Sequence, residues 1–158
     1  MIKIKRTTSA DNDFINLVRL LDADLAIRDG DDHAFYDQFN KIDTIKYAVV
    51  AYENNLPVAC GALKLFREGV MEVKRMFVLK EHRGKGIAGL VLLDLEDWAA
   101  ELIIKKIILE TGNQNQPEAV ALYKKQGYIV MENYGQYAGV VGSICFEKVL
   151  SVRNIMNP

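Results

Sequence analysis

The spacing of hydrophobic and polar side chains changes in the middle of the chain, between residues 79 and 87. From Val70 to Leu79 apolar and charged side chains alternate, and this period of two predicts a β-strand. From Ile87 onward apolar side chains recur every three to four residues, which predicts a helix. The strand should direct Met71, Val73, Arg75, Phe77 and Leu79 to one face and Glu72, Lys74, Met76 and Val78 to the other. The helix should bury Ile87, Val91, Leu95, Trp98 and Leu102.

Further stretches have the length and apolar content of strands, and turn residues separate them. They are 1–7, 46–52, 57–66, 105–110, 128–131 and 143–150. Because a strand–helix–strand crossover joins parallel strands, we expect the 105–110 strand to run parallel to the 70–79 strand. Gly61, inside a predicted strand, marks either a β-bulge or the close approach of another segment.

Capping residues indicate the remaining helices. Ser9 or Asp11 can cap a helix that should bury Phe14, Leu17, Val18, Leu21 and Leu25 on one face. The acidic run 29–32 should end that helix and cap a short second one, since it lacks the spacing of a calcium loop. Pro117 fits the first position of a last helix, and Gly127 fits its end. Together these elements describe one α/β domain spanning residues 1–158.

The composition narrows the classes of function that this protein can have. The chain has 20 basic and 21 acidic residues, and a net charge of −1 gives no general attraction to nucleic acid or to an anionic membrane. Cys60 and Cys145 do not form a disulfide or metal pattern, and His33 and His82 lack ligand spacing, so no metal is expected. No apolar run approaches membrane-spanning length. We therefore expect a cytoplasmic protein.

The turn between the central strand and helix has the features of an anion site. The first turn of a helix presents backbone N–H groups without intrahelical partners, and the helix dipole adds partial positive charge. Gly84 and Gly86 allow close approach of a ligand, and Arg83 and Lys85 add full charges. This arrangement favours a pyrophosphate, and the alternative is a plain strand-to-helix turn in which glycine serves only for packing. The glycine spacing fits neither the dinucleotide fingerprint nor the P-loop.

Two motifs resemble those of the GNAT superfamily of N-acetyltransferases. Residues 83–88 (RGKGIA) match its R-x-x-G-x-A acyl-CoA signature, and residues 113–128 (NQNQPEAVALYKKQGY) resemble its second signature. Gln116 departs from the second signature, where Asn is more usual. The resemblance implies a GNAT-like acyl-CoA N-acyltransferase fold, with a mixed, mostly antiparallel sheet of about six to seven strands flanked by about four helices. It also implies a sheet that splays beside the central strand.

The resemblance also implies contacts with acetyl-CoA. The backbone of the central strand would pair with the pantetheine arm, and the turn would hold the pyrophosphate. The residues implied are Phe77, Val78, Leu79, Arg83, Gly84, Lys85, Gly86, Ile87, Ala88, Gln116, Ala119 and Lys125.

For the chemistry, the resemblance implies direct attack of an amine on the thioester. Tyr123 would protonate the leaving thiolate, although an isolated tyrosine at this helical position would be interpreted as a core residue. Glu72 is the candidate base, with a surface carboxylate paired to Lys74 or Arg75 as the alternative interpretation. Glu110 and water are rivals for the same role.

These observations predict transfer of an acetyl group from acetyl-CoA to the primary amine of a small molecule. The alternatives are acetylation of a protein at a lysine or N-terminus, a CoA-binding module without catalysis, and a nucleotide phosphate-binding module. We also consider a homodimer, since the glycine-rich last loop and the final strand could form its interface.

Overall fold

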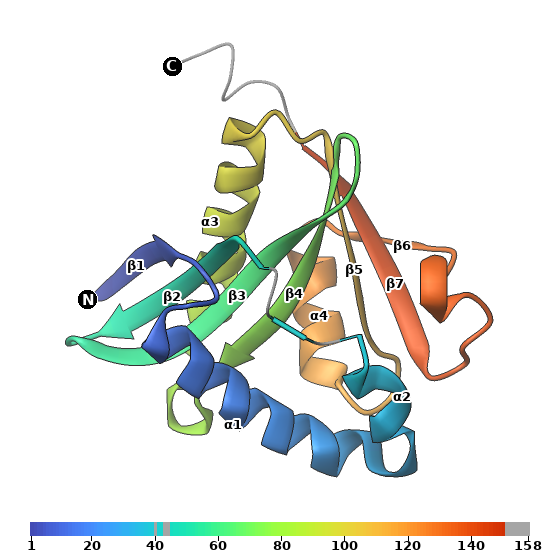
Figure 1. Ribbon diagram of the computed structural model, residues 1–158, viewed down its shortest axis with the longest axis horizontal. Helices are drawn as coiled ribbons and strands as arrows, with labels where there is room; N and C mark the ends of the chain where they lie inside the picture. The colour runs from blue at the N-terminus through green and yellow to red at the C-terminus, as the bar shows by residue number, and fades with distance from the viewer. Residues whose placement is uncertain (40, 43–44, 151–158) are drawn as a thin grey trace.

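The computed structural model describes residues 1–39, 41–42 and 45–150 (Figure 1). Its strands form one seven-stranded sheet in the order β1-β2-β3-β4-β5-β7-β6, and the sheet is antiparallel except where β4 meets β5. The strands are β1 (Ile2–Thr7), β2 (Tyr47–Glu53), β3 (Leu56–Arg67), β4 (Val70–Val78), β5 (Lys106–Gly112), β6 (Ile129–Met131) and β7 (Ser143–Val149). The α-helices among the described residues are α1 (Asn12–Asp29), α2 (His33–Asp37), α3 (Ile87–Glu101) and α4 (Pro117–Lys125). This architecture confirms the predicted mixed α/β fold.

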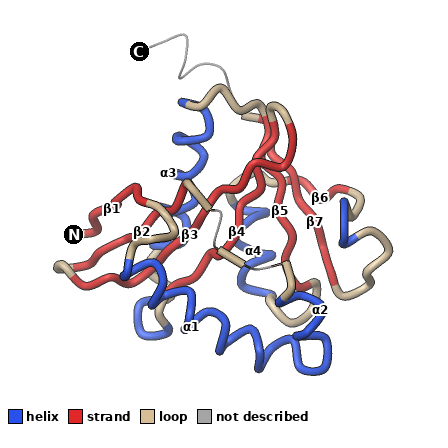
Figure 2. The backbone as a smooth tube through the Cα atoms, viewed as in Figure 1, coloured by secondary structure: helices blue, strands red, loops and turns tan. Residues whose placement is uncertain are grey.

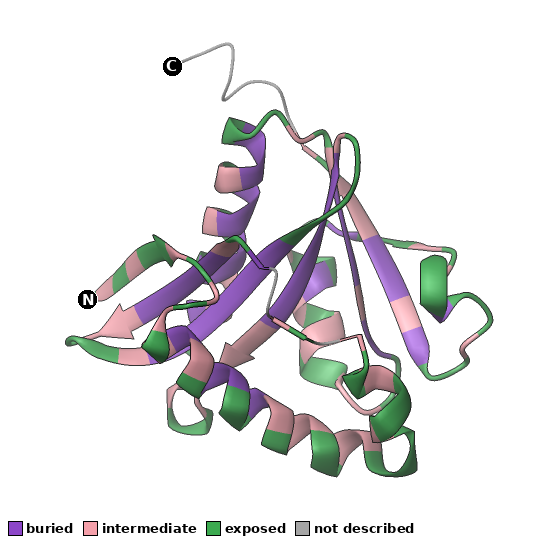
Figure 3. Ribbon diagram, viewed as in Figure 1, coloured by how far each residue is buried: buried purple, intermediate pink, exposed green. Residues whose placement is uncertain are grey.

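The sheet separates two hydrophobic cores, and the helices cover both of its faces (Figures 1 and 3). On one face α1 contributes Phe14, Leu17 and Val18 to a core with alternate side chains of β2 and β3. On the other face α3 packs Ile87, Val91 and Leu95 against the opposite side chains of the same strands. Side chains of β2 and β3 thus point alternately toward α1 and toward α3, as expected for a sheet that is buried on both faces.

Local sequence explains the helix boundaries only in part. Asp11 caps α1, since its carboxylate accepts hydrogen bonds from the N–H groups of Asp13 (2.8 Å) and Phe14 (3.2 Å). The expected capping of a second helix by the acidic run 29–32 is wrong, because Asp32 makes no side-chain bond to the start of α2. The expected apolar stripe of α3 is wrong at its end, where Leu102 is 37 % exposed and lies outside the helix.

The predicted alternation along β4 is wrong beyond Lys74, because the strand contains a β-bulge. Arg75 has a φ of +59°, and the pairing with β3 slips between Cys60 and Ala62. After the bulge Met76 packs toward α3, whereas Arg75 reaches Asp22 of α1. Both interpretations of Gly61 hold, since it lies at this slip and a Cβ there would come within 2.6 Å of the Met76 sulfur.

The sheet splays open between its two central strands, as predicted. β4 and β5 pair in parallel only from Val70–Lys106 to Glu72–Ile108, although β4 continues to Val78 and β5 to Gly112. Figure 2 shows the two strands diverging below their paired ends, with α4 beside the opening. Beyond Glu72, β4 therefore has no strand partner on the side of β5.

No helix in the described part of the chain is both long and apolar enough to span a membrane. The described residues also contain no group of three or more His, Cys, Asp or Glu side chains arranged to hold a metal ion.

Candidate active site

The turn from β4 into α3 presents a row of free backbone amides. Gly84 and Gly86 have φ values of +80° and +81°, a conformation that favours glycine. No side chain caps α3, and no backbone acceptor among the described residues bonds the amides from Gly84 to Gly89. Free amides at a helix start, with the positive end of the dipole behind them, form a cradle for an anion.

These amides border a groove with a volume of about 310 Å³ between α1, β4, α3 and α4. Of the predicted cofactor contacts, the structure places Phe77, Val78, Arg83, Gly84, Gly86, Ile87, Ala88, Gln116 and Ala119 along the groove. Leu79, Lys85 and Lys125 lie outside its lining. The sequence reasoning missed the contribution of α1, whose Leu21, Asp24 and Arg28 complete the groove.

The basic side chains of the turn have protein partners. Arg83 donates from Nε to the carbonyl oxygen of Val78 (2.9 Å), and its guanidinium lies over the Phe77 ring, 5.6 Å from the centroid. Lys85 instead points to Glu53, with 3.3 Å between Nζ and Oε1. Arg83 therefore remains next to the groove, while Lys85 pairs with β2.

The fit of an acyl-CoA to this groove follows from the donor set. A pyrophosphate needs several N–H donors, and the uncapped turn supplies them. The groove also contains the carboxylates of Asp24 and Glu118, and both pair with Arg28. A Cβ on Gly84 or Gly86 would meet no atom within 4 Å, so the space in front of the turn is open. Beyond the turn, the groove continues past Met76 and Val78 of splayed β4 to Gln116, just before α4, and to Tyr123 in α4.

Tyr123 lies where the groove meets a second, smaller pocket, and it lines both. Its ring is buried against Tyr128 and Phe146, with centroid separations of 5.8 and 5.9 Å. Burial raises the pKa of the Tyr123 phenol, and the Glu110 carboxylate adds to the effect. The hydroxyl is therefore a protonated donor throughout the neutral range.

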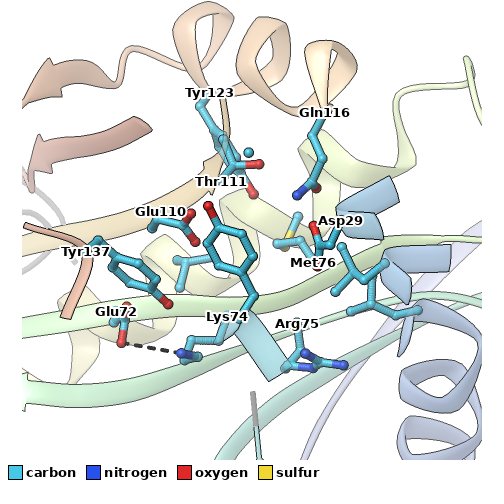
Figure 4. A pocket seen from close by; sticks show the side chains of 15 residues that line it. Asp29, Glu72, Lys74, Arg75, Met76, Glu110, Thr111, Gln116, Tyr123 and Tyr137 are labelled. Atoms are coloured by element: carbon cyan, nitrogen blue, oxygen red, sulfur yellow. Dashed lines mark ion pairs between the residues drawn. The ribbon is translucent and has the colours of Figure 1, made fainter. Parts of the chain in front are cut away.

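The second pocket, about 90 Å³, contains most of the remaining polar side chains (Figure 4). Its walls come from α1, α2, β4, β5 and α4. Asp29, Glu72 and Glu110 contribute carboxylates, and Tyr36 and Tyr137 contribute phenols. Figure 4 shows Glu110, Glu72 and Tyr137 on one side of the pocket and Gln116 and Asp29 on the other. We call this the inner pocket.

Glu110 is a buried carboxyl group of the inner pocket with a raised pKa. Burial raises the pKa of Glu110 to about 7, and a hydrogen bond with Ser143 and the charge of Lys74 only partly oppose this. A carboxylate with a pKa near 7 is half-ionised at neutral pH and can accept a proton there.

Glu72, the base expected from the sequence, is also buried and lines the same pocket. However, it accepts a hydrogen bond from the Tyr134 hydroxyl (2.6 Å), and Lys74 Nζ lies 3.8 Å from its other oxygen. Both oxygens of the Glu72 carboxylate therefore already have partners. Of the two carboxylates that the sequence offered, Glu110 is thus the one less engaged by neighbours.

The sequence reasoning did not identify Asp29, Tyr134 or Tyr137 as site residues. Tyr134 and Tyr137 flank a glycine in the loop before β7, and their ring centroids lie 5.7 Å apart. In the sequence, this pair of tyrosines in a glycine-containing loop is the signal that could have indicated site residues. Tyr36 reaches the same place from α2, where its hydroxyl lies 3.1 Å from the Ser143 hydroxyl.

An uncapped helix start facing a groove in a splayed sheet, with a buried phenol and a carboxylate at its inner end, fits an acyltransferase. The sequence model of the Acetyltransferase (GNAT) family matches residues 15–128, and the chain belongs to this family.

Relatives and solved structures agree with this assignment. The chain is 38 % identical over 103 residues to an IAA acetyltransferase of Azospirillum brasilense, covering 65 % of this chain and 67 % of the relative. It is 30 % identical over 95 residues to the uncharacterized N-acetyltransferase YjcF of Bacillus subtilis, covering 60 % and 64 %. The alignments thus span about two thirds of each relative.

Two solved structures show the fold over nearly the whole chain. An acyl-CoA N-acyltransferase structure from Klebsiella pneumoniae superposes with a TM-score of 0.80 at 28 % identity, covering 96 % of this chain and 99 % of the other. The PaiA N-acetyltransferase of Thermoplasma acidophilum, solved in complex with coenzyme A, superposes with a TM-score of 0.70 at 17 % identity, covering 94 % and 99 %.

Proposed function

We propose that the protein transfers the acetyl group of acetyl-CoA to the primary amine of a small molecule by direct attack. The observation that carries the proposal is the continuity of the site: the free amides from Gly84 to Gly89 open onto a groove that leads to Tyr123 and Glu110. The small inner pocket supports a compact acceptor group.

In this proposal the groove binds and orients acetyl-CoA. The turn amides hold the pyrophosphate, and the backbone of β4 after the bulge aligns the pantetheine arm in the splayed gap. Gln116 and Ala119 at the start of α4 form the opposite wall. Bound in this way, acetyl-CoA supplies a thioester whose carbonyl carbon is open to a nucleophile.

Two residues carry out the proton transfers in this proposal. An amine must lose a proton to attack, and Glu110 takes it, because its pKa of about 7 matches neutral conditions. Tyr123 donates from its hydroxyl toward the departing sulfur, and it lines both the groove and the inner pocket. Glu72 and Lys74 shape the acceptor side rather than moving the proton.

The test measures thiol release from acetyl-CoA across a panel of small primary amines, with acetylated product identified by mass spectrometry. The expected result is acceptor-dependent release of free CoA, with one acetyl group on the amine nitrogen. CoA binding without thiol release for any amine or peptide would favour a CoA-binding module. Acetylation of peptides and no small amine would favour a protein acetyltransferase.

A further inference from the structure

The acceptor side of the site has two compartments of opposite charge. The inner pocket adjoins an outer hollow of about 500 Å³, and Glu72 and Lys74 line both. Other walls of this outer hollow come from β3 and from the segments that follow α2 and precede β7. An acceptor that extends from the inner pocket past Glu72 and Lys74 therefore reaches the outer hollow.

The inner compartment carries an excess of carboxylates. Arg75 is committed to Asp22 of α1, and its side chain is only 1 % exposed. Among the described residues neither Asp29 nor Glu110 then forms an ion pair with a lysine or arginine, although the charge of Lys74 acts on Glu110 from a greater distance. Asp29 accepts a neutral hydrogen bond from the Asn115 amide at 3.0 Å and lies 3.5 Å from a His33 nitrogen. This environment attracts an ammonium group.

The outer compartment carries an excess of lysines. Lys41, Lys64 and Lys74 line it, whereas Glu72 is its one carboxylate among the described lining residues. Glu72 is already held by Tyr134 and Lys74. Lys64 stands directly opposite Glu72 in the β3–β4 register, is exposed, and forms no ion pair with a described residue. Phe39 and Phe66 supply apolar walls beside these charges.

We propose that the acceptor is a small amine with an anionic group at its far end, such as a carboxylate or a phosphate. This inference rests on the proposed function. The amine enters the acidic inner pocket, a short carbon chain passes the Glu72–Lys74 pair, and the anionic group meets Lys64 in the outer hollow. A diamine of the same length would place its second positive charge among these lysines, and an acceptor with an uncharged end would gain nothing from them.

The experiment compares three series of acceptors matched in chain length: straight-chain ω-amino acids, n-alkylamines and α,ω-diamines. The kcat/KM for each is measured by thiol release at saturating acetyl-CoA. We expect the best ω-amino acid to exceed its matched alkylamine by about three- to fivefold, the range for a partly exposed ion pair, and the diamine to fall below both. The preference should shrink as ionic strength rises.

Variants of Lys64 test the assignment of the outer hollow. The readout is the ratio of kcat/KM for the ω-amino acid to that for the matched alkylamine, which a general loss of active protein does not move. Lys64→Glu should invert the ratio, and Lys64→Arg should retain it. Lys3→Glu, an equal change at an exposed residue of β1 outside both compartments, should leave it unchanged.

The outcomes separate this inference from the proposed function. Acetylation of diamines or alkylamines at least as fast as ω-amino acids overturns the inference and leaves the proposed function standing. The inference is equally overturned if Lys64→Glu and Lys3→Glu give the same ratio of kcat/KM values. It is also overturned if an acidic peptide that contains a lysine has a higher kcat/KM than every ω-amino acid. Failure of every amine to release thiol removes the proposed function itself.

Discussion

Tyr123 has a hydroxyl that burial keeps protonated, and its removal should affect chemistry more than binding. Tyr123→Phe keeps the ring and its contacts with Tyr128 and Phe146. We expect kcat to fall about 100-fold, the lower range for loss of an acid catalyst, with the Kd for acetyl-CoA changed less than about twofold. Steady-state kinetics and calorimetric titration measure the two quantities.

Tyr128→Phe is the matched control, because it removes a neighbouring buried hydroxyl that bonds Glu96 at 2.9 Å. That loss should reduce the free energy of unfolding by about 1–3 kcal/mol and leave kcat near its normal value. Equal kcat values for Tyr123→Phe and the normal protein would exclude Tyr123 as the acid.

Glu110 gives the reaction a specific dependence on pH. With the pKa of Glu110 at about 7, kcat/KM should rise with pH through 7 and then level off. Glu110→Gln should lower the rate about 100-fold or more and abolish this inflection. The exposed Glu132→Gln serves as a control. If Glu72→Gln abolishes the inflection and Glu110→Gln does not, Glu72 is the base.

The same carboxyl links stability to pH. Its pKa is raised from 4.5 in the unfolded chain to about 7 in the folded protein, so the folded state binds the proton more tightly. The stabilisation by the neutral form is therefore present below pH 4.5 and lost as pH rises to 7. Relative to Glu110→Gln, the normal protein should lose about 3 kcal/mol of unfolding free energy across this window. Urea unfolding of both proteins at several pH values tests this.

At the scale of the element, the start of α3 depends on backbone amides rather than on side chains. Gly86 and Gly69 have nearly equal φ values, +81° and +77°, and a Cβ on either meets no atom within 4 Å. Replacing each with alanine should therefore cost a similar unfolding free energy, about 1–2 kcal/mol. Gly86→Ala places its methyl group beside the amide cradle, and we expect the Kd for CoA to rise at least about tenfold. Gly69, in the β3–β4 turn, lies outside the groove.

Comparing the two variants separates the effect of backbone strain on stability from the effect of the added methyl group on CoA binding. Calorimetric titration with CoA and urea unfolding should show equal stability but unequal affinity. An unchanged affinity in Gly86→Ala would contradict the cradle.

Also at this scale, β4 shows where pattern reasoning fails. A period of two identified the strand and its ends within one residue, because Met71 and Val73 face the core while Glu72 and Lys74 face the pockets. It could not locate the bulge, since Arg75 at positive φ depends on Asp22 in α1 and on Met76 fitting against Gly61. These are contacts between segments distant in the sequence.

At the scale of the whole molecule, the two halves of the splayed sheet are tied together by α1. Arg28 at its end binds Glu118 of α4 and the Asn115 carbonyl oxygen (3.2 Å). In return, the Asn115 amide donates to the Arg28 carbonyl oxygen (3.2 Å) and to Asp29 (3.0 Å). This tie crosses the open side of the sheet and borders the groove.

Asn115→Asp should loosen the tie, because it removes both donors and adds a negative charge beside Asp29. We expect the free energy of unfolding to fall by about 2 kcal/mol and the KM for acetyl-CoA to rise several-fold. Asn113→Asp adds the same charge at an exposed position of the same loop and is the control. If the two variants have equal KM values, the tie does not shape the groove.

The sequence predicted the cofactor side of the site better than the acceptor side, for a physical reason. The turn at Gly84–Gly86 and the start of α4 are local motifs, so the resemblance to a known family could name their residues, and most of them line one groove. The acceptor side draws Asp29 from α1, Tyr36 from α2, Glu110 from β5 and Tyr137 from a loop. Glu110 was expected from the sequence only as a rival base, and Asp29 and Tyr137 each resemble an ordinary surface or core residue on their own. Only the fold brings these side chains together.

The short pairing between β4 and β5 leaves β4 with an unpaired strand edge inside the protein, beyond Glu72. An edge at the rim of a sheet invites another chain to add to it, whereas this one is flanked by strands of its own sheet and covered by helices. Amide hydrogens facing the gap should therefore exchange with deuterium quickly, while those bonded to β3 exchange slowly. Bound CoA should slow only the first set, so the labelling pattern along β4 would trace the path of the pantetheine arm.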